Sequence, residues 1–229
     1  MNLYKIRGGT EQELLDKKYN IGIGISLGNK WFTPTNILEQ IKWALQYTHE
    51  YVVVYVADLI HAINLEVRND ISHERAVRVS VNKGEKILQE VKNLIETSLA
   101  ESDKQKIRYA TWSDLLTVDY VQKTKYLYDL YEQDENFRER LHSIVRGYTA
   151  NEAKSFSESE IHRLGMYIIE ELPEMVARVP IKDMAYDANA YPHSSGVVEL
   201  VDEIQQGLAF SEIKEKIMDT EPKVFLEVR

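Results

Sequence analysis

The chain contains no cysteine among its 229 residues. Disulfide bonds, thiolate nucleophiles, and zinc or iron–sulfur sites with cysteine ligands are therefore excluded. Histidines could still bind a metal, but none of them forms an H-E-x-x-H motif or a similar ligand spacing. They stand at positions 49, 61, 73, 142, 162 and 193. The sequence therefore predicts no metal site.

Long apolar runs and an excess of positive charge are also missing. No apolar segment approaches the length of a membrane span, and the N-terminal residues carry charges where a signal peptide would be apolar. The formal net charge of -9 argues against indiscriminate nucleic-acid binding through a positive surface. With 44% hydrophobic residues, the chain can bury one sizeable core. These features predict a cytoplasmic, single-domain protein in which a local basic patch would bind any polyanion.

Three apolar segments have the composition of buried strands. They span residues 20–26, 52–57 and 107–112. Thr33 and Pro34 begin a helix after the first segment, and Ser72 begins a long helix that runs to about residue 96. This alternation of strands and helices is typical of right-handed βαβ units. The sequence therefore predicts the α/β class, with a parallel sheet flanked by helices in one domain over residues 1–229.

The remaining segments are predicted as helices, loops and one short strand. Residues 1–19 are expected to form an irregular lead-in, and residues 114–151 two helices that break near Asp134. Ser157 and Glu160 form a capping box for a helix that Pro173 is expected to end. The other expectations are a strand at 176–179, a polar loop at 181–195 and a last amphipathic helix from 197 to Gly207.

The first predicted strand alternates apolar residues with glycine and ends at Ser26. Glycine weakens a strand, so its use at Gly22 and Gly24 indicates that another group approaches the backbone closely. Open parallel sheets bind their ligands at the carboxyl ends of their strands. Ser26 is therefore the leading candidate for a nucleophile.

Three other interpretations of this segment remain open. Residues 24–28 match the G-x-S-x-G elbow of α/β-hydrolases, with Asp187 and His193 as candidate partners, although the helix signal comes only at Pro34. The glycines are similar to a dinucleotide-binding fingerprint, but the third glycine comes one position late. Finally, Ser26 can simply end the strand and bond to a backbone group.

A second candidate site lies on the helix that Ser157 caps. Tyr167 and Glu171 stand four residues apart, so their side chains can meet beside the buried stripe, whereas Glu170 is expected to point to solvent. The helix dipole disfavours a carboxylate at Glu171, in the last turn before Pro173. A carboxylate held at this position indicates that it binds a cation. The alternative is that the Glu171 side chain extends to water and that Tyr167 simply packs against the rest of the protein. The stripe consists of Ile161, Leu164, Ile168 and Leu172.

Four sequence blocks together resemble the tRNA-dependent cyclodipeptide synthase family. They are Gly24-x-Ser26, Tyr-Val-Ala-Asp-Leu-Ile-His-Ala at 55–62, Tyr167-x-x-x-Glu171-Leu172-Pro173, and Tyr191-Pro192. The resemblance implies a Rossmann-like fold similar to the catalytic domain of class I aminoacyl-tRNA synthetases. It also implies a reaction that joins the amino acids of two aminoacyl-tRNAs into a diketopiperazine. No cofactor is expected, because the ester is already activated and the H-x-G-H and K-M-S-K-S motifs for ATP are missing.

The resemblance further implies roles for individual residues. Ser26 resembles the nucleophile that accepts the first aminoacyl group. Tyr167 and Glu171 resemble the pair that holds its amino group and takes part in proton transfer. Tyr191 resembles the tyrosine that assists the later steps and ring closure.

Three further residues are expected at the substrate site by the same resemblance. They are Gly24, Asn29 and Pro192. Tyr191-Pro192 is typical of the Tyr-Pro subfamily, whereas an asparagine three residues after the serine belongs to the other subfamily. The chain is therefore predicted to be a Tyr-Pro member with an unusual Asn29.

The best candidate for a tRNA contact is the long helix that begins at Ser72. Its polar, basic stripe consists of Arg75, Arg78, Asn82 and Lys86, with Lys83 adjacent. Basic side chains along one helix face can contact phosphates, although a solvated surface would have the same pattern. The predicted partners are two aminoacyl-tRNAs, with no membrane, and the chain is expected to be a monomer.

Overall fold

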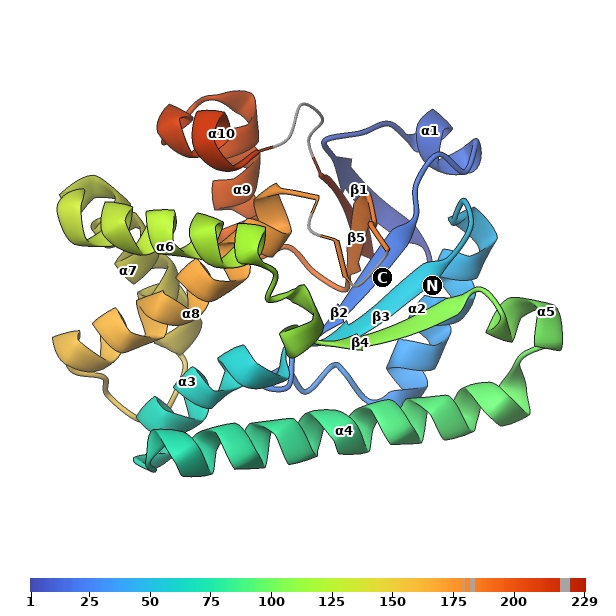
Figure 1. Ribbon diagram of the computed structural model, residues 1–229, viewed down its shortest axis with the longest axis horizontal. Coiled ribbons are helices and arrows are strands. Elements are labelled where there is room, and N and C mark those ends of the chain that lie inside the picture. Colours follow the sequence, from blue (N-terminus) through green and yellow to red (C-terminus); the bar gives the residue numbers. More distant parts are fainter. Residues whose placement is uncertain (179, 182–183, 219–222) are drawn as a thin grey trace.

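The computed structural model describes residues 1–178, 180–181, 184–218 and 223–229. Its strands form one sheet in the order β1-β6-β5-β2-β3-β4 (Figure 1). All neighbouring strands are parallel except β1 and β6. The strands are β1 (Leu3–Arg7), β2 (Ile21–Ile25), β3 (Val52–Val56), β4 (Ile107–Thr111), β5 (Ala188–Tyr191) and β6 (Val224–Val228). The predicted α/β fold with a parallel sheet flanked by helices is therefore confirmed, with β1 as an added antiparallel edge strand.

Helices connect the strands and cover both faces of the sheet (Figure 1). The helix predicted after Thr33, the long helix after Ser72, the break at Asp134 and the stop at Gly207 are confirmed. The α-helices are α1 (Glu11–Leu15), α2 (Pro34–Tyr47), α3 (Asp58–Asn69), α4 (His73–Ser98), α5 (Glu101–Lys104), α6 (Val118–Gln133), α7 (Glu135–Thr149), α8 (Glu158–Val176), α9 (Gly196–Gln206) and α10 (Ser211–Ile217); a 3₁₀ turn spans Trp112–Leu115.

Each face of the sheet has its own apolar core. Along β3, Val52, Val54 and Val56 pack with α2 and α4, whereas Val53 and Tyr55 belong to the core formed with α6 to α10. This burial on both sides explains the continuous apolar run of β3, since neither face meets solvent.

The topology places a crevice beside the end of β2. From β2 the chain proceeds to β3 and β4 on one side, while β5 and β6 lie on the other. Ligands of open α/β sheets bind outside the carboxyl ends of strands where the order reverses in this way. Ser26 follows β2 and Tyr191 ends β5, so both lie at this edge.

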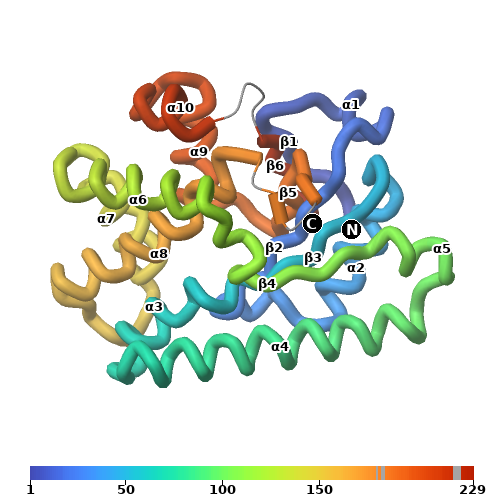
Figure 2. The backbone as a smooth tube through the Cα atoms, viewed as in Figure 1, coloured from blue at the N-terminus to red at the C-terminus, as the bar shows by residue number. Residues whose placement is uncertain are grey.

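Both chain ends differ from the prediction. The expected irregular lead-in at 1–19 is wrong, since it contains β1 and α1, and the helix ending at Gly207 is followed by α10 and β6. The two ends meet where Asn2 and Arg229 exchange backbone hydrogen bonds of 2.7 and 2.9 Å (Figure 2). A strand that depends on a partner more than 200 residues away leaves little trace in its local sequence pattern.

Three predictions for the middle of the chain are also corrected. Pro173 does not end α8, because the following turn is buried and continues to Val176. The strand expected at 176–179 is wrong for its described residues, since Val176 is helical and Ala177 caps the helix; residue 179 lies outside the described ranges. The loop expected at 181–195 contains β5, which pairs with β2 and β6. Helix α3 was not predicted.

A buried ion pair joins the last described segment to α8. Lys223 Nζ lies 2.6 Å from Glu174 Oε1, and the side chains are 0% and 3% exposed. We expect Lys223→Met to lower the free energy of unfolding by about 3–5 kcal/mol, because Glu174 would keep an uncompensated buried charge. Urea denaturation measures the change. Lys216→Met, an exposed lysine of α10, is the matched control, and an equal effect of both substitutions would contradict the prediction.

Candidate active site

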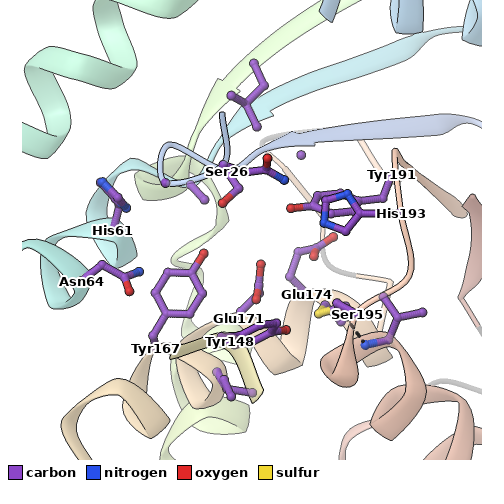
Figure 3. Close-up of a pocket in the computed structure, with 18 of the residues that line it drawn as sticks. Ser26, His61, Asn64, Tyr148, Tyr167, Glu171, Glu174, Tyr191, His193 and Ser195 are labelled. Atoms are coloured by element: carbon purple, nitrogen blue, oxygen red, sulfur yellow. Dashed lines mark hydrogen bonds between the residues drawn. The ribbon is translucent and has the colours of Figure 1, made fainter. Parts of the chain in front are cut away.

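A cavity of about 640 Å³ opens between the sheet edge and helix α8. Its walls include the end of β2, one face of α3, the end of α7, α8 and the residues that follow β5. Four predicted catalytic side chains line it, and Figure 3 shows them turned toward a common space. They are Ser26, Tyr167, Glu171 and Tyr191. Residues as distant as 26 and 191 are therefore brought together by the fold.

Ser26 stands on a turn that directly follows β2. The Asn29 amide donates to the Ser26 carbonyl at 3.2 Å, and the Trp31 amide donates to Asn29 Oδ1 at 2.9 Å. Helix α2 begins only at Pro34, so the sharp strand-to-helix elbow of a hydrolase is not formed. The turn leaves the Ser26 side chain partly exposed to the cavity.

The proposed hydrolase partners of Ser26 do not assemble into a triad. Asp187 precedes β5 and accepts a hydrogen bond from the Asn20 amide at 3.0 Å, at the start of β2. Because β2 and β5 are parallel, Asp187 lies at the opposite end of the strands from Ser26. His193 does line the cavity. The spacing of 24–28 thus matches the hydrolase motif without the geometry that the chemistry needs.

The strand glycines make room for tyrosine rings. A Cβ atom on Gly24 would stand 2.6 Å from the Tyr55 hydroxyl, and one on Gly22 would overlap the Tyr186 ring. The predicted close approach to the backbone is therefore real. At both glycines the approaching group is a tyrosine of the protein itself, and Gly24 in addition lines the cavity. Since both glycines lie inside β2, they do not form the phosphate-binding turn of a dinucleotide site.

Glu171 lies on the cavity-facing side of α8. Burial, and then the negative charge of Glu174, raise its pKa to about 8. No cation in the described part of the chain is among the causes of this shift, so the carboxyl is largely protonated at neutral pH. An ammonium group entering the cavity would supply the missing positive charge and favour the carboxylate.

Two tyrosines flank Ser26. Burial raises the pKa of Tyr167 well above its usual value, and the charge of Glu171 adds to the shift. Burial and Glu171 also raise the pKa of Tyr191. Hydrogen bonding by Ser26 opposes the pKa shift of both phenols, which places its hydroxyl beside each of them. Both tyrosines stay protonated at neutral pH and can donate protons.

Asn29 and Pro192 lie next to these catalytic candidates. Asn29 lines the cavity, and its hydrogen bond opposes the raised pKa of Tyr191. Pro192, the residue after Tyr191, is buried and is not among the residues that line the cavity. The Tyr191 ring packs on Phe32 at 5.4 Å between centroids. Asn29 is therefore placed to orient the Tyr191 hydroxyl.

The expectation that Glu170 points to solvent is wrong. Its Oε1 accepts a hydrogen bond from the Tyr128 hydroxyl at 2.8 Å, and burial raises its pKa. The reason is tertiary, because α6 packs on this side of α8 and covers it. Glu170 does not line the cavity, so the two neighbouring carboxyl groups have separate surroundings.

Several cavity residues were not selected as site residues from the sequence. They are His61, Asn64, Tyr148 and Ser195. His61 and Asn64 share one face of α3, a helix that was not predicted. Burial, then the charges of Lys83 and Arg68, lower the pKa of His61 to about 4, so its ring is neutral. The only feature of the sequence that could have pointed to His61 as a cavity residue is its position within the block at 55–62.

The basic stripe of α4 lies on the protein surface. Arg75, Arg78 and Lys86 are exposed, with Glu74 at 4.0 Å from Arg78 and Glu90 at 3.9 Å from Lys86. The Lys83 ammonium instead donates to the Leu27 carbonyl, next to Ser26. The stripe is thus accessible, whereas the Lys83 ammonium is bonded to the turn that follows Ser26.

Two negative findings concern the described residues only. Over the ranges that the structure describes, no cluster of three or more histidine, aspartate or glutamate side chains could hold a metal ion. Among the described helices, none has the length and apolar character needed to cross a membrane.

Comparison with known proteins gives a consistent result. The family model described as cyclodipeptide synthase matches residues 5–213. No curated protein matches the chain.

Solved structures that are similar to the chain share its fold at low sequence identity. A cyclodipeptide synthase from Staphylococcus haemolyticus is 16% identical, with 100% of both chains covered and a TM-score of 0.74. A Mycobacterium tuberculosis protein is 18% identical over 85% of this chain and 83% of its own, with a TM-score of 0.65. Its structure is described as demonstrating that cyclodipeptide synthetases are related to type I tRNA-synthetases. The enzyme from Candidatus Glomeribacter gigasporarum bound to Phe-tRNAPhe is 16% identical over 92% and 88%, with a TM-score of 0.57.

Proposed function

This chain belongs to the cyclodipeptide synthase family, and on that premise we propose that it joins the amino acids of two aminoacyl-tRNAs into a diketopiperazine. The observation that carries the proposal is the convergence of Ser26, Tyr167, Glu171 and Tyr191 on one cavity at the carboxyl ends of the strands. The mechanism is ping-pong, with the growing product held on Ser26.

In the first step, the Ser26 hydroxyl attacks the ester carbon of the first aminoacyl-tRNA. The Oγ–carbon bond forms, the bond to the ribose oxygen breaks, and the serine proton ends on the released ribose hydroxyl. Backbone amides near Gly24 and Ser26 are candidate donors to the oxyanion. An ester is already activated, so this exchange requires neither ATP nor a histidine base.

Glu171 and Tyr167 are proposed to hold the amino group of the bound residue. The free carboxyl has a raised pKa of about 8 because it is buried beside Glu174. A bound ammonium would lower the pKa of Glu171 again and so favour the carboxylate. Proton transfer from the ammonium to the carboxylate would then release the free amine as a nucleophile. The amine then attacks the ester carbon of the second aminoacyl-tRNA, the bond to the ribose oxygen breaks, and the amine's proton ends on the released ribose hydroxyl, which leaves a dipeptidyl-enzyme.

Ring closure releases the product from Ser26. The new amine attacks the acyl carbon, the bond to Ser26 Oγ breaks, and we assign to Tyr191 the transfer of the proton: it protonates Oγ and regains a proton from the amine. Closure needs a cis peptide bond, which costs roughly 2.5–4 kcal/mol for ordinary residues. A cavity that holds the amine beside its own acyl carbon offsets this cost through a high effective concentration.

The α4 stripe is proposed to contact tRNA phosphates. The double substitution Arg75→Glu with Arg78→Glu should weaken binding of aminoacyl-tRNA at least about tenfold and flatten its salt dependence. Binding titrations over a range of salt concentrations measure both effects. The pair Lys125→Glu with Lys216→Glu makes the same charge change on α6 and α10, across the molecule from α4 (Figure 1). Equal losses for the two pairs would indicate a general charge effect and refute the assignment.

Mass spectrometry of medium from cells that produce the protein tests the function directly. A cyclodipeptide that is missing from control cells is the expected result. Hydrolysis of simple esters without tRNA would favour a hydrolase, and tRNA binding without product would favour a non-catalytic tRNA-binding module. Membership of the Tyr-Pro subfamily, with Asn29 as an unusual feature, stays a prediction, as do the cytoplasmic location and the monomeric state.

A further inference from the structure

Beyond Glu171 the cavity continues to a polar inner end. Tyr55, Glu174 and Asn189 all line the cavity and are 4%, 2% and 5% exposed. The catalytic steps proposed above use none of them. Most of the nearby wall is apolar or aromatic, with Trp112, Met175 and Phe225 among its residues.

The inner end lies where the side chain of a Ser26-bound residue would point. Tyr167, Glu171 and Glu174 follow one face of α8, and Glu174 lies about 4.5 Å further along the helix than Glu171. Opposite them, Asn189 pairs in register with Gly22, four residues before Ser26 on the neighbouring strand. An amino group at Glu171 and an acyl carbon at Ser26 therefore leave the side chain to run toward Glu174 and Asn189.

One hydrogen-bond acceptor at this end is left without a donor from the described residues. Oε1 of Glu174 accepts bonds from Lys223 Nζ at 2.6 Å, from Asn189 Nδ2 at 3.0 Å and from the Tyr186 hydroxyl. Asn189 thereby uses its amide nitrogen, and its Oδ1 has no hydrogen-bond partner among the residues that the structure describes. That oxygen would be 3.0 Å from a Cβ atom on Gly22, so it lies over this strand position together with the Tyr186 ring.

We propose that Asn189 and Glu174 select a neutral side chain with a hydrogen-bond donor, a hydroxyl or a carboxamide, for the amino acid that Ser26 accepts. This rests on the proposed function. An apolar side chain would leave the Asn189 acceptor unpaired, which sites built for hydrogen bonding penalise strongly. An acidic side chain would approach the Glu174 carboxylate, and Lys223 already supplies the cation for that group.

A second buried amide gives an internal control. Gln40 is 0% exposed, and its Nε2 donates to the Ala190 carbonyl at 2.9 Å. Its Oε1 also lacks a partner within the described part of the chain. It lies on α2, which packs on the other face of the sheet, and it does not line the cavity. Gln40 and Asn189 thus share a buried, unpaired oxygen next to β5, but only Asn189 belongs to the cavity wall.

The test measures acylation of Ser26 by single aminoacyl-tRNAs, with the acyl-enzyme trapped by acid and identified by intact-protein mass spectrometry. Matched pairs are Tyr against Phe, Gln against Met, Asn against Leu and Thr against Val, with Glu against Gln as the charge test. The expected result is a preference of about 100-fold or more for the polar member of at least one pair, and for Gln over Glu. A polar preference below tenfold in all four polar–apolar pairs would overturn the proposal.

Substitution of Asn189 then tests the assigned residue. Asn189→Leu should reduce the preference for the polar side chain at least about tenfold, while Gln40→Leu should leave it unchanged. An unaltered preference in a folded Asn189→Leu protein would overturn the assignment. If that variant does not fold, as judged by circular dichroism, the competition in the unmodified protein still decides the question.

Failure of this inference is distinguishable from failure of the proposed function. Cyclodipeptides made only from apolar residues would overturn the inference and leave the function intact. No acyl-enzyme and no cyclodipeptide with any aminoacyl-tRNA would overturn both.

Discussion

Ser26→Ala should abolish cyclodipeptide formation, with a loss of about 10⁴-fold or more, because no other group would carry the acyl intermediate. The side chain is partly exposed in a cavity and caps no helix, so its removal should leave the fold intact. Product detected by mass spectrometry and secondary structure measured by circular dichroism check the two parts of the prediction.

Ser143→Ala is the matched control for this substitution. Ser143 is an exposed residue of α7 outside the cavity, and its replacement should leave product formation unchanged. A Ser26→Ala protein that keeps more than a small fraction of the activity would remove Ser26 as the nucleophile. The cavity would then serve direct attack by the amino group of one aminoacyl-tRNA on the ester carbon of the other, with release of its tRNA.

Glu171→Gln should lower product formation by about 10²–10⁴-fold, because an amide can neither balance an ammonium charge nor accept its proton. The neighbouring substitution Glu170→Gln makes the same chemical change on the same helix. Glu170 is bonded to Tyr128 away from the cavity, so that variant should stay near the activity of the unmodified protein. Similar losses in both variants would mean that α8 is merely sensitive to substitution.

Glu171→Gln, which should lower activity, should increase stability relative to the unmodified protein as the pH rises. The pKa of Glu171 is raised from 4.5 to about 8 in the folded protein. Between these values the folded state holds a proton that the unfolded chain releases, so the free energy of unfolding falls as pH rises and levels off above pH 8. Glu171→Gln removes this dependence. Its stability relative to the unmodified protein should therefore rise between pH 5.5 and 8, by at most about 1.4 kcal/mol per pH unit.

Urea denaturation at both pH values measures this difference. The increase should be seen without tRNA, because a bound ammonium would remove its cause. A stability difference that does not change with pH would show that Glu171 is already ionised in the free protein. It would also remove the reason for regarding the carboxyl as poised for a cation.

Local patterns were enough for the centre of the fold. The apolar runs of β2, β3 and β4 and the capping residues Thr33 and Ser157 are signals that act over a few residues, and the structure contains the elements that they predict. The same holds for the position of Ser26, since a strand end is a local feature. Sequence patterns failed at β1, β5 and β6, which are short strands that depend on pairing with distant segments.

The sequence by itself determined the class of fold, the place of Ser26 after a buried strand, and the common helix face of Tyr167 and Glu171. These follow from periodicities of a few residues. Only the tertiary structure decided what surrounds them. Helix α6 covers Glu170, the rings of Tyr55 and Tyr186 fill the space over the strand glycines, and Lys223 reaches Glu174 from 49 residues away. The raised pKa of Glu171 arises from such long-range burial, which short-range sequence patterns do not encode.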